Sequence, residues 1–107
     1  MFDHGVTHFE AYIDFVVGMQ VEAPDQFVEL DFLPEEHQLN LESGFRILNE
    51  KLYLVEPHMK QPGVMPQLRE LLKESQAAYE AGEDIRGAHL LQDFESLILK
   101  NATHRDD

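Results

Sequence analysis

The chain has 107 residues, of which 43% are hydrophobic, and it contains no cysteine. It carries 21 acidic and 8 basic side chains, which gives a formal net charge of −13 at pH 7. This composition fits a single domain, 1–107, with enough apolar residues for a core, and it excludes disulfides, thiolate metal sites and a cysteine nucleophile. The negative charge also argues against direct nucleic-acid binding, because Lys and Arg must neutralise the phosphates.

The negative charge is concentrated in the N-terminal half. The first basic side chain is Arg46, so residues 1–45 carry a net charge of −10 and residues 46–107 carry only −3. If solubility were the only requirement, a mixture of positive and negative side chains would suffice. Charges of one sign repel one another and destabilise the folded chain. This segregation therefore favours an anionic surface that binds a partner.

The first predicted element is an amphipathic helix. Thr7 and Glu10 have the spacing of a capping box, which predicts a helix that begins at His8 and ends near Ala23, before Pro24. Its apolar side is predicted to consist of Phe9, Tyr12, Ile13, Val16, Val17, Met19 and Gln20. Glu10 and Asp14 then lie on the opposite side, and Phe15 falls outside the main apolar arc.

The middle of the chain, residues 24–56, supports two predictions. The favoured one is a helix from Pro34 to Pro57, because five apolar residues recur at steps of four and three: Leu41, Phe45, Leu48, Leu52 and Val55. The alternative is a short antiparallel meander within residues 26–55, with a turn at Ser43-Gly44. Gly44 is unfavourable in the helix and favourable in the meander.

The C-terminal region predicts a helical hairpin. Pro66 suits the first turn of a helix that Gly82 ends, and Asp84 can cap the next helix. A connection this short makes the two helices antiparallel, and small residues near the turn, including Gly87, would let them approach closely. The inward residues of the second helix are predicted to be Gly87, Leu90, Leu91, Phe94, Leu97, Ile98 and Asn101.

These elements predict a mainly α fold, a small helical bundle with a C-terminal αα-hairpin; the alternative is an α+β fold that contains the meander. No apolar run approaches the roughly 18 residues of a membrane span. The first ten residues lack both the basic and the continuous apolar region of a signal peptide. We therefore expect a cytoplasmic protein that does not contact membranes.

Motifs for catalysis are absent from the sequence. There is no Gly-rich phosphate loop, no Gly-x-Ser-x-Gly and no HExxH pattern, so we expect a non-catalytic protein without a cofactor. The alternative is a small helical metal-binding protein or enzyme that uses His4 and His8, which are four residues apart and adjoin Asp3 and Glu10.

The favoured function is an acidic binding or regulatory protein whose N-terminal half docks on a basic partner protein. Inhibitors, immunity or antitoxin proteins, secretion chaperones and nucleic-acid mimics act in this way. A homodimer that buries an exposed apolar face is a further alternative. The predicted partner-binding residues are eight acids and one aromatic residue: Glu10, Asp14, Phe15, Glu22, Asp25, Glu29, Asp31, Glu35 and Glu36.

Overall fold

The computed structural model describes residues 4–23, 34, 38–61 and 63–102. These residues form four α-helices and two short 3-10 helices: α1 (Phe9–Glu22), α2 (Leu41–Glu50), η2 (Leu52–Leu54), η3 (Glu56–His58), α3 (Val64–Glu80) and α4 (Asp84–Asn101). The predicted mainly α fold is confirmed. Residues 38–55 contain no strand, so the meander is wrong for that segment; residues 26–33 and 35–37 lie outside the described residues.

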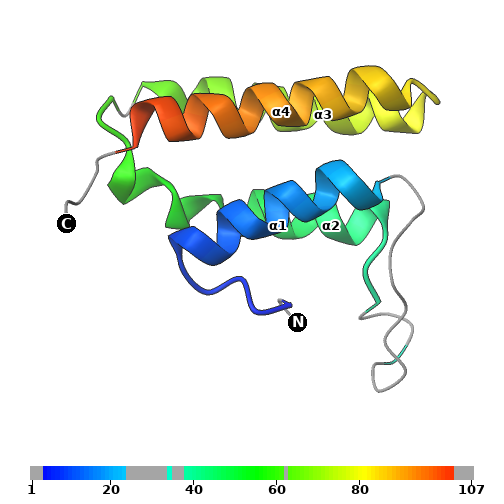
Figure 1. The fold of residues 1–107 in the computed structure, drawn as a ribbon, viewed down its shortest axis with the longest axis horizontal. Coiled ribbons are helices and arrows are strands. Elements are labelled where there is room, and N and C mark those ends of the chain that lie inside the picture. The colour runs from blue at the N-terminus through cyan, green and yellow to red at the C-terminus, as the bar shows by residue number, and fades with distance from the viewer. Residues whose placement is uncertain (1–3, 24–33, 35–37, 62, 103–107) are drawn as a thin grey trace.

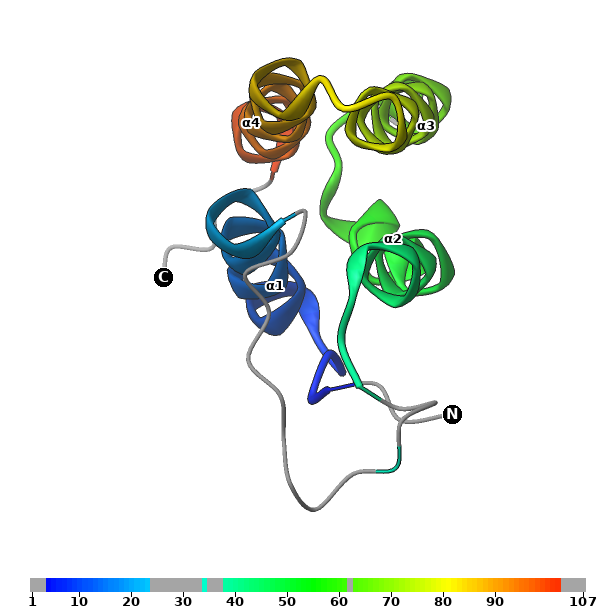
Figure 2. The ribbon, with the colours of Figure 1, turned by 90° about the vertical axis from the view of Figure 1, so that its right-hand side faces the viewer.

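The four α-helices form an up-down-up-down bundle (Figure 1). Each successive helix reverses direction, and α3 and α4 lie above α1 and α2. Seen end-on, α1 is diagonally opposite α3, and α2 is diagonally opposite α4 (Figure 2). Each helix therefore packs against two neighbours, and none of the four is long and apolar enough to cross a membrane.

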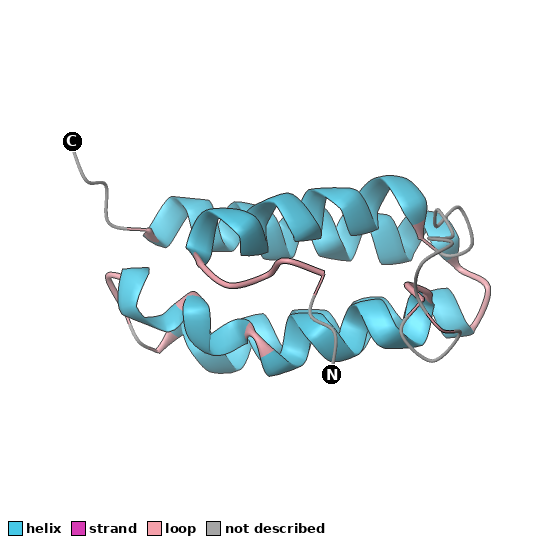
Figure 3. Cartoon of the chain, turned by 90° about the horizontal axis from the view of Figure 1, so that it is seen from below, coloured by secondary structure: helices cyan, strands magenta, loops and turns pink. Residues whose placement is uncertain are grey.

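The core runs along the centre of this bundle and takes side chains from each of the four α-helices. The largest fully buried side chains include Tyr12, Phe45, Leu72 and Phe94. The segment before α1 passes between α1 and α2 on the lower side of the bundle (Figure 3), where Val6 is buried against the core. At one end, an antiparallel bridge joins Met59 to Ala102 and connects the segment before α3 to the end of α4.

Helix α2 begins later than the sequence predicted. Its N-cap is Asn40, whose side chain accepts a 2.8 Å hydrogen bond from the Ser43 amide, while the Ser43 hydroxyl accepts one from the Asn40 amide. This reciprocal pair fixes the start of α2 at Leu41. The predicted single helix from Pro34 to Pro57 is thus wrong in its bounds, because α2 ends at Glu50 and the shorter turns η2 and η3 follow.

Gly44 lies where α2 packs against the side chain of Met19 in α1. A Cβ atom on Gly44 would lie only 2.8 Å from Cε of Met19, which is fully buried in α1. The absence of a side chain therefore lets the two helices approach closely, and the cost in helix propensity that the sequence suggested is offset by packing.

The C-terminal hairpin agrees closely with its prediction. Gly82 has a φ of +84°, and hydrogen bonds from Gly82 N to Tyr79 O and from Glu83 N to Ala78 O form a Schellman motif at the end of α3. Gly87 faces the Tyr79 ring, where an added Cβ would lie 2.7 Å from the nearest ring atom. The predicted cap is wrong: Glu83 occupies the N-cap without a side-chain hydrogen bond, and Asp84 is the first residue of α4.

Candidate binding surface

Helix α1 carries three of the eight acidic residues that the sequence singled out, Glu10, Asp14 and Glu22. It begins at Phe9 rather than His8, and its N-cap, His8, makes no side-chain capping bond. The Thr7 hydroxyl instead lies 3.2 Å from Nδ1 of His8, so the predicted capping box is wrong. The predicted end is confirmed, because Ala23 leaves the helical region with a ψ of 146°. Glu10 in the first turn still interacts favourably with the helix dipole.

Four exposed side chains form one stripe along α1, which we call the α1 outer face: Glu10, Asp14, Val17 and Val21. Their separations of four, three and four residues confine them to about 60° around the helix. Val17 is 41% exposed and Val21 is 73% exposed. The prediction that Val17 lies on the apolar side with Tyr12 is therefore wrong, and Val17 shares the face with the acids.

The two carboxylates of the α1 outer face have no counter-ion in the part of the chain that the structure describes. Within the described residues, neither Glu10 nor Asp14 forms an ion pair or a hydrogen bond, and α1 contains no basic residue. Residues four apart on a helix are neighbours at about 5–6 Å, so these like charges repel each other. Ionised carboxylates only accept hydrogen bonds, which makes this part of the surface suited to Lys and Arg donors.

The apolar half of this surface continues across the seam between α1 and α4. Nε2 of Gln20 donates a 2.8 Å hydrogen bond to Oε1 of Glu95 on α4. Val17 precedes Gln20 by about one turn of α1, and Leu99 follows Glu95 by about one turn of α4. Because α1 and α4 are antiparallel (Figure 1), both residues lie on the same side of this bond along the bundle axis. Leu99 is 47% exposed, so it extends the apolar area beside Val17.

The other predicted partner-binding residues are less accessible or fall outside the part of the chain that the structure describes. Phe15 is partly buried and packs against the core, and Glu22 is partly buried at the end of α1. Asp25, Glu29, Asp31, Glu35 and Glu36 lie outside the described residues. The structure thus groups Glu10 with Asp14 on one exposed face and adds two valines that the sequence analysis had not selected.

The alternative metal site lacks the geometry proposed for it. His4 has a φ of +54° and precedes a glycine at +83°, so the chain turns before α1 begins. His4 and His8 therefore do not occupy one helix face. The described residues contain no group of three or more His, Asp or Glu side chains positioned to hold a metal ion.

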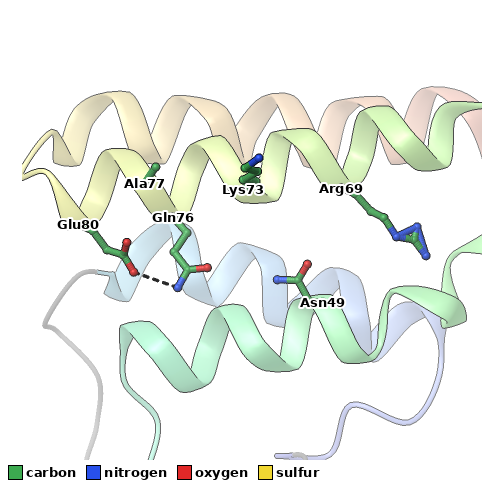
Figure 4. A pocket seen from close by; sticks show the side chains of 6 residues that line it. All are labelled: Asn49, Arg69, Lys73, Gln76, Ala77 and Glu80. Atoms are coloured by element: carbon green, nitrogen blue, oxygen red, sulfur yellow. Dashed lines mark hydrogen bonds between the residues drawn. The ribbon is translucent and has the colours of Figure 1, made fainter.

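A second surface feature was not predicted. A groove between α2 and α3 is lined by Asn49, Arg69, Lys73, Gln76, Ala77 and Glu80 (Figure 4). The four-residue spacing of Arg69 and Lys73 could have indicated a basic spot on α3. Their position opposite Asn49 depends on the packing of α2, which the sequence left open.

No family model, curated protein or solved structure matches this chain. The functional argument therefore depends on the surface chemistry of the bundle itself.

Proposed function

We propose that the protein is a non-catalytic binding or regulatory protein that docks the α1 outer face on a basic partner protein. One observation carries the proposal: Glu10 and Asp14 are exposed, adjacent and without counter-ions among the described residues, and exposed Val17 and Val21 follow on the same face. An inhibitor, an immunity or antitoxin protein, a secretion chaperone or a nucleic-acid mimic would need such a surface.

The two halves of the face would contribute differently to binding. The carboxylates would attract a basic surface from a distance and set its orientation, an effect that salt screens over about 8–10 Å. Val17, Val21 and neighbouring Leu99 would supply apolar area that binding removes from water. The partner should therefore present Lys or Arg beside an apolar patch.

Solubility is the competing explanation for the acids. The charges at the hairpin turn are arranged differently: Nη1 of Arg86 lies 3.4 Å from Oε1 of Glu83, so opposite charges are paired on an exposed surface. On α1 no such mixture of signs occurs. The exposed valines beside the acids also work against solubility, which favours binding as the role of this face.

The experiment compares capture of partners from native lysate by three forms of the protein. The wild type is compared with Glu10→Gln/Asp14→Asn, which neutralises the face, and with Asp84→Asn/Asp93→Asn. The second variant removes the same charge from two exposed carboxylates on α4. We expect the wild type and the α4 variant to capture the same basic protein, and the α1 variant to lose it.

A third variant separates charge from apolar contact. Val17→Ser/Val21→Ser keeps both carboxylates and should slow the association little while it speeds dissociation. Equal capture by all forms, or a captured protein whose binding is insensitive to salt, would contradict the proposal.

A further inference from the structure

The groove between α2 and α3 has a cationic end, which is unusual in a protein with a net charge of −13. Its volume is about 570 Å³, within the range of roughly 300–1,000 Å³ that small-molecule sites occupy. Arg69 and Lys73 extend from α3, and Asn49 faces them from α2 (Figure 4).

Arg69 and Lys73 are available to a ligand. Both are exposed, and neither forms an ion pair or a hydrogen bond within the described part of the chain. They are four residues apart, which places them one turn apart on the same flank of α3. An Arg fork can bind two oxygens of a carboxylate or phosphate, and a Lys ammonium adds a point charge beside it.

The opposite end of the groove is acidic but distant. Oε2 of Glu80 accepts a 3.1 Å hydrogen bond from Nε2 of Gln76 (Figure 4). Glu80 is seven residues from Lys73 and eleven from Arg69, or about 10 and 16 Å along the helix axis. Salt screens charges at these separations, so Glu80 opposes an anion at Arg69 only weakly.

The two amides are held in defined positions. Nδ2 of Asn49 donates a 2.8 Å hydrogen bond to the Phe45 carbonyl in its own helix, while Gln76 is bound to Glu80. The groove therefore offers two free cationic groups and two oriented amides. We propose that it binds a small ligand through an oxyanion group, a phosphate or a carboxylate, at Arg69 and Lys73.

A second copy of this chain is a poor occupant. The α1 outer face is the obvious anionic candidate, but α1 is diagonally opposite α3 in the bundle (Figure 2). A two-fold dimer pairs a patch with itself and would need both features on the same side of the molecule. The geometry therefore favours a separate small anion over self-association.

The test follows the side-chain amide signals of Asn49 and Gln76 by NMR during titration of the full chain. Inorganic phosphate is added in one arm and succinate in the other, at constant ionic strength. We expect saturable shifts in at least one arm, and the arm with the lower dissociation constant identifies the class of oxyanion.

Matched variants assign the binding to the groove. Arg69→Gln/Lys73→Gln should weaken binding about tenfold or more. Arg86→Gln/Lys100→Gln removes two positive charges elsewhere and should leave the dissociation constant within about twofold. Ala77→Glu, which adds a carboxylate to the exposed lining of the groove, should also weaken binding.

Three results would overturn the inference. The first is the absence of saturable shifts with both anions. The second is an equal loss of affinity in the Arg86→Gln/Lys100→Gln control, which would indicate general screening. The third is unchanged binding in both groove variants while circular dichroism shows that their helices are intact.

Discussion

The hydroxyl of Tyr12 in α1 donates a 2.6 Å hydrogen bond to the backbone carbonyl of Leu48 in the last turn of α2. The last four carbonyls of a helix have no partner within that helix, so a side chain 36 residues away completes the end of α2. Both groups are buried. This bond therefore couples the fold of the acidic N-terminal helix to the stability of its neighbour.

Removing this hydroxyl should destabilise the bundle. In Tyr12→Phe, the Leu48 carbonyl stays buried without its donor, which should lower the free energy of unfolding by about 1–3 kcal/mol. Urea denaturation followed by circular dichroism measures this change. Tyr53→Phe is the control: Tyr53 is 58% exposed, so its loss of a hydroxyl should cost less than about 0.5 kcal/mol. Equal effects would show that the Tyr12 hydrogen bond adds no stability.

The same substitution at Tyr79 should not destabilise the protein. Tyr79 is buried, but its hydroxyl has no hydrogen-bond partner within the described residues. Tyr79→Phe removes this unsatisfied polar group, so the variant should be as stable as the wild type or up to about 2 kcal/mol more stable. Thermal and urea unfolding provide the comparison. A marked loss of stability would reveal a partner for this hydroxyl.

Stability should fall at alkaline pH because of these two tyrosines. Burial raises the pKa of Tyr12 and of Tyr79 above the ordinary value of 10.0, and nearby Asp84 adds to the rise at Tyr79. Above pH 10 the unfolded chain releases protons that the folded chain retains, so stability present below pH 10 is lost as the pH rises further.

The contribution of Tyr12 to this slope should approach the limit for one group, about 1.4 kcal/mol per pH unit, as the pH rises above 10, and Tyr79 should add a contribution of the same sign. Urea unfolding at about pH 9 and about pH 11 measures the combined slope, and Tyr12→Phe should reduce it. Phenolate absorbance checks the cause directly. A slope unchanged in Tyr12→Phe would contradict this assignment.

Two glycines in the bundle should respond oppositely to alanine. An added methyl group at Gly44 meets Met19, so Gly44→Ala should destabilise the protein by about 1–3 kcal/mol. At Gly18 in α1 nothing lies within 4 Å of an added Cβ, and the better helix propensity of alanine should stabilise the protein by about 0.4–1 kcal/mol.

A double-mutant cycle identifies the contact responsible. Met19→Ala removes the side chain that Gly44→Ala would meet, so the combined variant should lose less stability than the sum of the two single variants. Strict additivity would mean that the cost at Gly44 arises elsewhere.

The sequence predicted the hairpin well because its signals are local. Gly82 ends α3 through a positive φ, and the short connection to α4 leaves only an antiparallel arrangement. The inward residues Gly87, Leu91, Phe94 and Ile98 are buried as predicted. Helical spacing sufficed here because α3 and α4 each pack more extensively against the other than against α1 or α2.

The middle of the chain and the candidate sites depended on contacts between distant segments. By sequence alone, Gly44 is unfavourable because glycine has a low helix propensity. In the structure its lack of a side chain leaves room for Met19 of another helix. Val17 belongs by hydropathy to the apolar side, but the neighbours of α1 leave it exposed beside Glu10 and Asp14. Sequence spacing gives the angular position of each residue around the helix axis. The packing of the neighbouring helices decides which side of the helix faces solvent.

The measurement closest to the central claim is the association rate constant of the captured basic partner with wild-type protein and with Glu10→Gln/Asp14→Asn, at about 0.05 M and about 0.5 M salt. We predict that the wild type associates at least about tenfold faster at low salt and that the variant loses most of this advantage, while Asp84→Asn/Asp93→Asn retains it. Association rates that are equal for all three forms at both salt concentrations would contradict docking through the α1 outer face.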